Sequence, residues 1–273
     1  MDELIRDGRT LRHRVTGNGP AMVFVHGWCG DHSAFAPQIE HFARTHRVVA
    51  PDLRGHGASD PAASYDIADF ADDVAWVSRR LDLDRPVVVG HSMGGMVAVE
   101  AAAAYPDVFP AAVALDAPVV DDPILAAGVD YQLELFGGPR REHEGPDFLR
   151  SVLWGPYDDQ DRATSIIASM MQTPAEVALP SLAALKTWVP RRRLLDCAQP
   201  VLCVHIRGGG PTDPTSLAID RPNVMVAQTI GAGHFIQLEV ADQVNAMIER
   251  FLAATAVHGR PAGAAGPCEI LRQ

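Results

Sequence analysis

Ser92 is the residue whose surroundings most clearly suggest chemistry, and it lies in the run Gly90-His91-Ser92-Met93-Gly94. Three consecutive valines precede this run and predict a buried strand, because a parallel strand is covered on both faces and need not alternate. Small and apolar residues follow it and predict a helix. Ser92 therefore stands on a sharp strand-to-helix turn, where Gly90 and Gly94 avoid collisions with the folded backbone. Such a nucleophile elbow lifts the serine hydroxyl above the edge of a sheet.

A serine hydroxyl is a weak nucleophile unless a neighbouring base removes its proton. The run Gly231-Ala232-Gly233-His234-Phe235 follows the last predicted strand and forms a loop that could swing an imidazole over Ser92. We therefore predict His234 as the base. Three other histidines adjoin glycine-rich loops and are expected to hold those loops together by hydrogen bonds: His26, His56 and His91.

A third group, an acid that orients the base, has two candidates in the sequence. Asp116 ends the predicted strand 111–115, which follows the helix after Ser92. Asp213 lies later, in the glycine-rich stretch 207–214, directly before Pro214. Asp213 could equally cap the N-terminus of a helix. Either aspartate gives the chain order Ser, Asp, His, so the residues alone leave both candidates open.

Composition and charge limit the classes of function. The chain has 273 residues, 47% of them apolar, as in an ordinary globular protein. Its formal charge of −11 argues against nucleic acids and anionic membranes as partners, because both attract basic patches. The N-terminal residues lack a signal-peptide pattern, and no apolar run is long enough for a bilayer. Its four cysteines show no metal-ligand spacing, which predicts a cytoplasmic protein with reduced thiols and no metal or other cofactor.

Alternating strands and helices predict an α/β fold with a mostly parallel sheet covered on both faces. In such sheets, reactive residues lie on loops at the carboxyl ends of the strands. The alternation lapses between residues 117 and 197, where helical pieces and Pro-Gly breaks predict an inserted helical cap. The expected organisation is therefore a core formed by residues 1–116 and 198–257, a cap at 117–197 and a flexible tail at 258–273.

Four motifs resemble those of the α/β-hydrolase superfamily in order and spacing: Val25-His26-Gly27-Trp28, Asp52-Leu53-Arg54-Gly55-His56-Gly57-Ala58-Ser59, Gly90-His91-Ser92-Met93-Gly94-Gly95 and Gly231-Ala232-Gly233-His234-Phe235. The resemblance covers most of residues 10–255 outside the cap. It implies an eight-stranded sheet, a nucleophile–acid–base triad, and an oxyanion hole formed by the backbone N–H groups of Trp28 and Met93. Most relatives carry the acid after the next-to-last core strand, in a Gly-x-x-Asp setting that is absent here. Some draw it from the place of Asp116, which we favour over Asp213.

A narrower resemblance supports that choice of acid. Gly27-Trp28-Cys29-Gly30-Asp31-His32, the loop at Asp213 and Leu115-Asp116 are similar to cofactor-independent dioxygenases that cleave hydroxyquinolone rings. Those enzymes keep the hydrolase triad and take the acid from the place of Asp116. The stretch Met93-Gly94-Gly95, however, is the ordinary hydrolase version.

The sequence thus predicts a serine hydrolase that cleaves a small, uncharged, moderately hydrophobic carboxylic ester or lactone through an acyl-enzyme. The alternatives are a carbon–carbon bond hydrolase or a cofactor-independent dioxygenase that uses the same triad, or a non-catalytic small-molecule receptor. The expected partner is a small-molecule substrate, with no nucleic acid or membrane. The oligomeric state is left open. Apolar cap residues are expected to contact the substrate: Leu133, Leu135, Phe136, Leu153 and Trp154.

Overall fold

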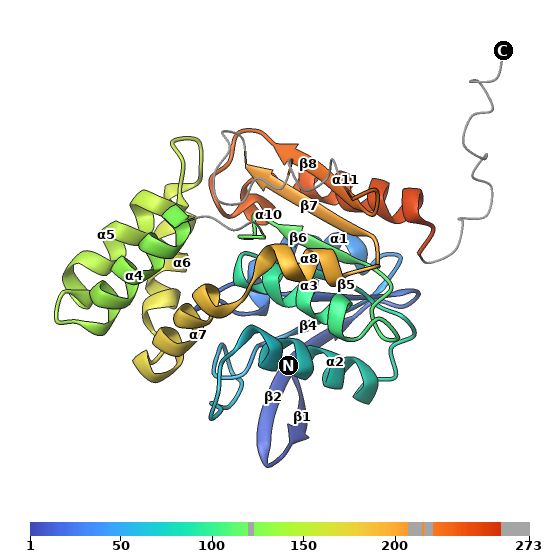
Figure 1. Cartoon of the computed structure of the whole chain (residues 1–273), viewed down its shortest axis with the longest axis horizontal. Helices are drawn as coiled ribbons and strands as arrows, with labels where there is room; N and C mark the ends of the chain where they lie inside the picture. The colour runs from blue at the N-terminus through green and yellow to red at the C-terminus, as the bar shows by residue number, and fades with distance from the viewer. Residues whose placement is uncertain (120–122, 207–214, 216–220, 258–273) are drawn as a thin grey trace.

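An eight-stranded sheet forms the centre of the computed structural model, which describes residues 1–119, 123–206, 215 and 221–257 (Figure 1). The strands are β1 (Asp2–Arg6), β2 (Arg9–Thr16), β3 (Ala21–Val25), β4 (Arg47–Pro51), β5 (Val87–His91), β6 (Ala112–Leu115), β7 (Val201–Ile206) and β8 (Val224–Thr229). Their spatial order is β1-β2-β4-β3-β5-β6-β7-β8. The β1–β2 and β2–β4 pairs are antiparallel, and every pair from β4 to β8 is parallel. This arrangement confirms the predicted α/β-hydrolase fold.

Helices cover both faces of the sheet and form the insert between β6 and β7. They are η1 (His32–Phe35), α1 (Ala36–Phe42), α2 (Ile67–Arg80), α3 (Met93–Ala104), α4 (Pro123–Gly137), α5 (Arg141–Leu153), α6 (Gln160–Met171), α7 (Ala175–Thr187), α8 (Pro190–Asp196), α10 (Ile236–Glu239) and α11 (Ala241–Thr255). No helix in the described part of the chain is long and apolar enough to cross a membrane.

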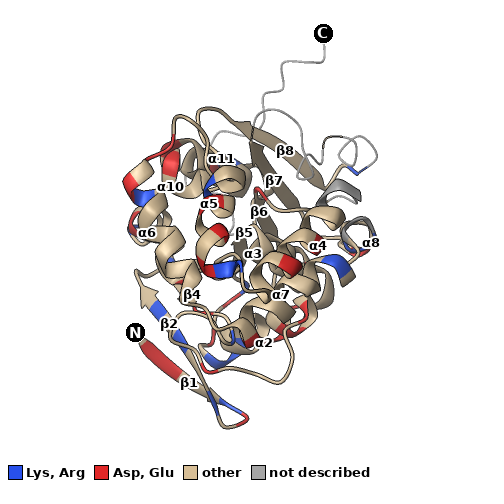
Figure 2. Ribbon diagram, turned by 90° about the vertical axis from the view of Figure 1, so that its left-hand side faces the viewer, with Lys and Arg blue, Asp and Glu red and all other residues tan. Residues whose placement is uncertain are grey.

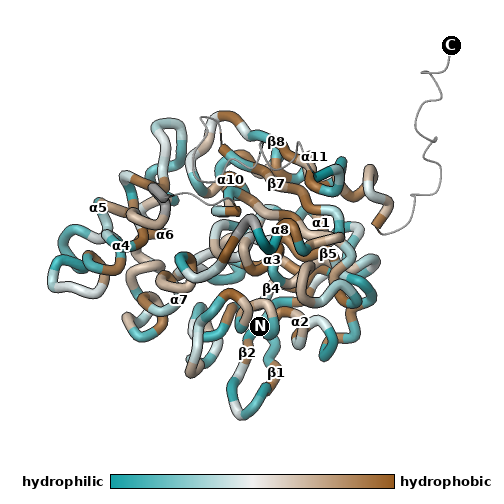
Figure 3. Tube along the Cα trace, viewed as in Figure 1, coloured by the Kyte–Doolittle hydropathy of each residue, from teal (hydrophilic) through white to brown (hydrophobic). Residues whose placement is uncertain are grey.

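The central strands contribute alternate residues to two apolar layers. In β5, Val88 packs in the layer that contains α2 and α3, whereas Val87 and Val89 pack in the layer that contains α1 and α11. All three valines are fully buried, which explains why this strand is continuously apolar. Figure 3 shows the same distribution, with hydrophobic stretches such as β7 inside and hydrophilic ones on outer turns.

Helix α2 illustrates how local sequence places a covering helix. Its apolar residues recur every three or four positions, and those at 67, 70, 74 and 77 are buried against the sheet. Asp66 and Asp69 form a capping box at the first turn, and Arg79 and Arg80 occupy the last turn. This charge order favours the helix dipole. The helix is therefore amphipathic, with its apolar face on the sheet.

The N-terminal hairpin extends the sheet beyond the parallel strands. Figure 2 shows acidic positions on β1 beside basic positions on β2, and Arg12 pairs with Glu3 at 2.8 Å. Arg6 reaches from β1 to Asp73 of α2 at 2.8 Å, and Arg54 bonds the same buried carboxylate at 2.6 Å. The two arginines therefore tie the hairpin and the loop after β4 to one helix.

Helix α7 contributes Val177 and Ala184 to the core layer of α2 and α3, and it also shares a second apolar cluster beside the sheet with α4, α5 and α6 (Figure 1). Trp28 and Phe235, from loops at the carboxyl edge of the sheet, pack against the same cluster. Helix α8 differs because it packs on α3, where buried Glu100 accepts hydrogen bonds from Trp188 Nε1 at 2.8 Å and Arg193 at 2.7 Å. The C-terminal end of the predicted cap segment, helix α8, thus packs in the layer that contains α3. The tail at 258–273 lies outside the described residues.

Candidate active site

Ser92 occupies the turn between β5 and α3 with a strained backbone, at φ 54° and ψ −124°. Such a conformation is costly for a residue with a side chain and persists only where its surroundings enforce it. A Cβ at residue 90 would lie 1.8 Å from the carbonyl oxygen of Gly94, and one at residue 94 would lie 2.2 Å from that of Val25. The two flanking glycines are therefore required by close backbone approach, as the sequence predicted.

Asp116 reaches the same edge because β6 runs parallel to β5, with Leu115 paired to His91. It is 2% exposed and also has a positive φ, 41°. Its Oδ2 accepts a hydrogen bond from His234 Nδ1 at 2.6 Å, and its Oδ1 faces the backbone N–H of Ile206 at 3.3 Å. The structure thus brings Asp116 to the imidazole. The alternative acid, Asp213, lies outside the described residues.

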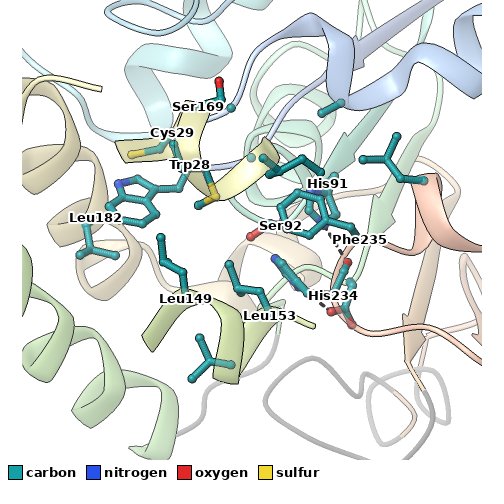
Figure 4. Close-up of a pocket in the computed structure, with 18 of the residues that line it drawn as sticks. Trp28, Cys29, His91, Ser92, Leu149, Leu153, Ser169, Leu182, His234 and Phe235 are labelled. Atoms are coloured by element: carbon teal, nitrogen blue, oxygen red, sulfur yellow. Dashed lines mark hydrogen bonds and ion pairs between the residues drawn. The ribbon is translucent and has the colours of Figure 1, made fainter. Parts of the chain in front are cut away.

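His234 lies on the loop between β8 and α10, and both of its backbone polar groups are bonded. Its N–H donates to the carbonyl of Leu153 at 2.8 Å, and its carbonyl accepts from His91 Nε2 at 2.9 Å. The side chain is 17% exposed and opens to the cavity. Figure 4 shows the ring turned toward the Ser92 hydroxyl, with its other side toward the carboxylate. The imidazole therefore stands between the serine and the acid.

The loop after β3 covers Ser92 from the other side. A Cβ at Gly27 would lie 3.1 Å from Ser92 Cβ, so this glycine permits the loop to approach the turn. Trp28 follows, and its indole Nε1 donates to the carbonyl of Ala178 in α7 at 2.8 Å. Met93 is the first residue of α3, where backbone N–H groups have no partner within the helix. The two predicted oxyanion-hole residues thus flank Ser92.

A cavity of about 560 Å³ opens above these residues, between the sheet edge and the helical insert (Figure 4). Its floor contains Ser92, His234 and Asp116, and the insert supplies most of its apolar wall. The wall residues from the insert are Pro118, Val129, Gln132, Leu149, Val152, Leu153, Arg162, Ile166, Ser169, Met170, Leu182 and Leu185. A cavity of this size suits a small organic substrate.

Only one of the five cap residues expected at the substrate site, Leu153, is among the described residues that line the cavity. Leu135 is fully buried inside the insert, and Phe136 packs edge-on against Trp28 with centroids 5.3 Å apart. Trp154 stacks on Phe235 at 4.7 Å. Leu133 also packs in the cluster of the insert. All four pack in the apolar cluster of the insert, because apolar helix residues can face either a cavity or the helix interior, and their contact with a substrate stays a prediction.

Two polar residues of the insert that the sequence analysis did not single out lie beside the site. Asp158 is 6% exposed and accepts a hydrogen bond from the N–H of Gly233, next to His234. Arg162 lines the cavity and pairs with Glu239 at 3.0 Å. Their contacts join segments about 80 residues apart, which no local pattern indicates. The nearby Gly155-Pro156 pair predicts a turn, but it does not indicate that Asp158 would contact Gly233.

The three loop histidines lie buried and make the predicted hydrogen bonds. His26 Nδ1 donates to the carbonyl of Gly27 at 2.8 Å, while its Nε2 accepts from the N–H of Leu53 at 3.0 Å. His56 Nδ1 donates to the carbonyl of Arg54 at 2.9 Å. Burial lowers the pKa of His56 to about 3 and that of His91 to about 3, and it also lowers the pKa of His26. These rings are therefore neutral near pH 7.

Comparison with known proteins defines the class. A family model for the alpha/beta hydrolase fold matches residues 20–241. The chain is 31% identical over 253 residues to 2-(acetamidomethylene)succinate hydrolase of Mesorhizobium japonicum, a match that covers 86% of this chain and 88% of that protein. The chain therefore belongs to the α/β hydrolase family of enzymes.

Solved structures have the same fold. An esterase from Thermogutta terrifontis superposes with a TM-score of 0.82 at 22% identity, covering 94% of this chain and all of that one. The enol-lactonase of Burkholderia xenovorans LB400 superposes with a TM-score of 0.81 at 21% identity, covering 92% of this chain and all of that one. At these identities the likeness concerns the fold alone.

His56 makes the stability of the protein depend on pH. The unfolded chain protonates this histidine near pH 6.5, but the folded protein does so only near pH 3, so the unfolded state binds more protons in between. The free energy of unfolding should therefore fall as pH drops through this window, by up to about 1.4 kcal/mol per pH unit for this group. The free energy of unfolding, measured by urea titration at several pH values between 7 and 4.5, should change less with pH in His56→Gln than in the wild type. Equal changes in the two proteins would contradict this, and His143→Gln, at an exposed position, is the control.

Proposed function

We propose that this hydrolase is a serine enzyme that cleaves a small, uncharged, moderately hydrophobic carboxylic ester or lactone through an acyl-enzyme. In this proposal Ser92 is the nucleophile, His234 the base and Asp116 the acid. The backbone N–H groups of Trp28 and Met93 form the oxyanion hole, and the helices within residues 117–197 act as a cap over the substrate.

The observation that carries this proposal is the 2.6 Å hydrogen bond from His234 Nδ1 to Asp116 at the floor of the cavity. Because the carboxylate accepts the Nδ1 proton, the other ring nitrogen remains free to accept the proton of Ser92. Figure 4 shows that nitrogen turned toward the serine hydroxyl. The strained φ of Ser92 further supports a role in chemistry, since strain of this kind collects at functional sites.

The proposed reaction has two stages. His234 takes the proton of Ser92 as the hydroxyl oxygen attacks the carbonyl carbon, and the negative oxygen of the tetrahedral intermediate accepts hydrogen bonds from Trp28 and Met93. The imidazolium then protonates the leaving alcohol oxygen, and the acyl group stays on Ser92. In the second stage His234 deprotonates a water, whose oxygen attacks the acyl carbonyl. The bond between the acyl carbon and the Ser92 oxygen then breaks, the imidazolium returns its proton to that oxygen, and the carboxylic acid is released. Loss of one oxyanion-hole donor typically raises such a barrier by about 2.7–4 kcal/mol.

The charges of the cavity support an uncharged substrate. Among the described residues of the wall, Arg162 carries the only fixed positive charge. That charge is already balanced by Glu239 at 3.0 Å and Asp159 at 3.8 Å, and its guanidinium also donates to the carbonyl of Leu238 at 3.1 Å. A carboxylate in the substrate would therefore lie next to Asp31 and Asp116 without a free cation, which is costly for a desolvated charge.

Loss of the nucleophile or the base tests the activity itself. Ser92→Ala and His234→Ala should each lower kcat/KM for p-nitrophenyl butyrate by on the order of 10⁴-fold or more, with the fold intact. A fluorophosphonate probe should label Ser92 in the wild type, as shown by peptide mass mapping. Labelling of another residue would contradict the assignment. If wild type and variants are equally inert while ligands raise Tm, the protein is a receptor, and oxygen uptake with a hydroxyquinolone would indicate a dioxygenase.

The acid is tested by comparing the two aspartates. Asp116→Asn should lower kcat on the order of 10⁴-fold, because an amide cannot stabilise the imidazolium and favours the wrong tautomer. Asp213→Asn should lower kcat by less than about tenfold, as for a helix cap or a solvated residue. Steady-state kinetics of both variants, with Tm measured in parallel, give the answer. The reverse order of effects would assign the role to Asp213.

Substrate charge is tested with a matched pair of esters. p-Nitrophenyl hydrogen succinate carries a carboxylate, and its methyl ester has nearly the same length without the charge. The methyl ester should have the higher kcat/KM, by about tenfold or more, mainly through a lower KM, since the charged acyl chain finds no free cation. A preference for the charged ester that disappears in Arg162→Gln would instead show that Arg162 binds carboxylates.

A further inference from the structure

The corner between α5 and α6 holds the loop that carries His234. The carbonyl of Leu153, the last residue of α5, accepts from the N–H of His234 at 2.8 Å. The carboxylate of Asp158 accepts from the N–H of Gly233, with both oxygens at 3.0 Å, and from the N–H of Gly155 at 2.7 Å. Two consecutive N–H groups of this loop therefore bond the insert rather than the sheet domain.

Gly233 shows how closely these two segments approach. A Cβ at this residue would lie 2.6 Å from Asp158 Oδ2, 2.7 Å from the backbone nitrogen of Gly155 and 2.8 Å from the carbonyl oxygen of Leu153. All three clashing atoms belong to the insert. The absence of a side chain at residue 233 thus serves the contact with the insert.

Further contacts surround this pair of bonds. The ring of Trp154 stacks on Phe235 at 4.7 Å with an interplanar angle of 23°. The N–H of Asp159 donates to Glu239 of α10 at 3.0 Å, and Arg162 donates to the carbonyl of Leu238 at 3.1 Å. The corner 153–162 and the segment 233–239 therefore form a continuous interface beside the imidazole.

We propose that Asp158 is a positioning residue for the catalytic reaction, acting through the backbone of His234; this rests on the proposed role of His234 as the base. The carboxylate fixes the N–H of Gly233 and so limits rotation of the peptide that precedes the base. Gly231, two residues earlier, has a positive φ of 82° and open space around it, so the loop offers little restraint of its own there. The insert supplies the missing restraint.

The geometry explains why this restraint matters for turnover. Asp116 is anchored to the sheet, whereas His234 is held from both sides: its carbonyl accepts from His91 of β5, and its N–H and that of Gly233 bond Leu153 and Asp158 of the insert. The geometry of the 2.6 Å bond between the two side chains therefore depends on the position of the insert relative to the sheet. A displacement of about 1 Å in such an arrangement can lower the rate on the order of 10²-fold. Docking of the insert is thus coupled to alignment of the base.

The test replaces the acceptor with a group of the same size. Asp158→Asn turns one carboxylate oxygen into an amide nitrogen, which donates. Because both carboxylate oxygens accept from the N–H of Gly233, this new donor faces that N–H in either orientation of the amide. The substitution should lower kcat for p-nitrophenyl butyrate on the order of 10- to 100-fold, with KM within about twofold of wild type. Gly233→Ala disrupts the same contact from the other side and should act in the same direction. The control is Asp161→Asn, which removes the same charge at an exposed position in the first turn of α6 and should keep the wild-type kcat.

A double mutant separates positioning from general structural support. If Asp158 acts through His234, adding Asp158→Asn to His234→Ala should not lower the residual kcat/KM further. For the wild type and Asp158→Asn, rates are divided by the concentration of sites that a fluorophosphonate labels. For His234→Ala and the double mutant, rates are divided by the concentration of folded protein, measured by circular dichroism. The proposal would be overturned if Asp158→Asn had the kcat of the wild type. It would also be overturned if Asp158→Asn lowered the rate by the same factor in the wild type and in His234→Ala. Full activity in His234→Ala would instead refute the proposed function, a result distinguishable from either.

Discussion

The hydrogen bond between His234 and Asp116 is the interaction on which the arrangement of the site depends. It joins a loop after β8 to the residue that ends β6, across 118 positions of the chain. The parallel register of β5 and β6 places Asp116 beside the turn of Ser92, whose N–H donates to the carbonyl of Leu115 at 2.9 Å. A shift of one residue in that register would move the carboxylate to the opposite face of the sheet. The register of two central strands therefore determines whether the Asp116 carboxylate can reach the His234 imidazole.

Close packing of backbone around Ser92 is the second requirement. Gly90 and Gly94 leave no room for a side chain against neighbouring backbone, and a Cβ at Gly27 would make a tight contact with Ser92 at 3.1 Å. The loop after β3, the elbow turn and α3 consequently form one rigid unit around the serine. Positive φ values at Ser92, Cys29 and Asp116 show that the surrounding structure holds strained backbone at this edge. This rigidity is what preorganised donors for a developing negative charge require.

The electrostatics of the site follow from burial. His91 lies against His234, with centroids 4.5 Å apart, yet burial keeps it neutral, so it does not place a second positive charge beside an imidazolium. Arg162 is balanced by two carboxylates, so the cavity contributes little fixed charge apart from Asp31 and Asp116. The insert then encloses this edge with apolar side chains. These features agree with the chemistry proposed for a neutral carbonyl compound.

The sequence by itself determined the fold class, the elbow at Ser92 and the loop of His234, because each rests on local signals: glycine spacing, valine runs and apolar periodicity. It also indicated Asp116, since a residue that ends a strand beside the elbow strand must emerge at the same sheet edge. Only the tertiary structure decided which faces of the insert helices line the cavity. Leu135, Phe136 and Trp154 are apolar residues of the insert, as Leu153 is. Only the packing of the helices shows that Leu153 lines the cavity and that the other three lie in the apolar cluster. The contact of Asp158 with Gly233 was equally beyond local patterns, because it depends on how α5 and α6 dock against a loop 75 residues away.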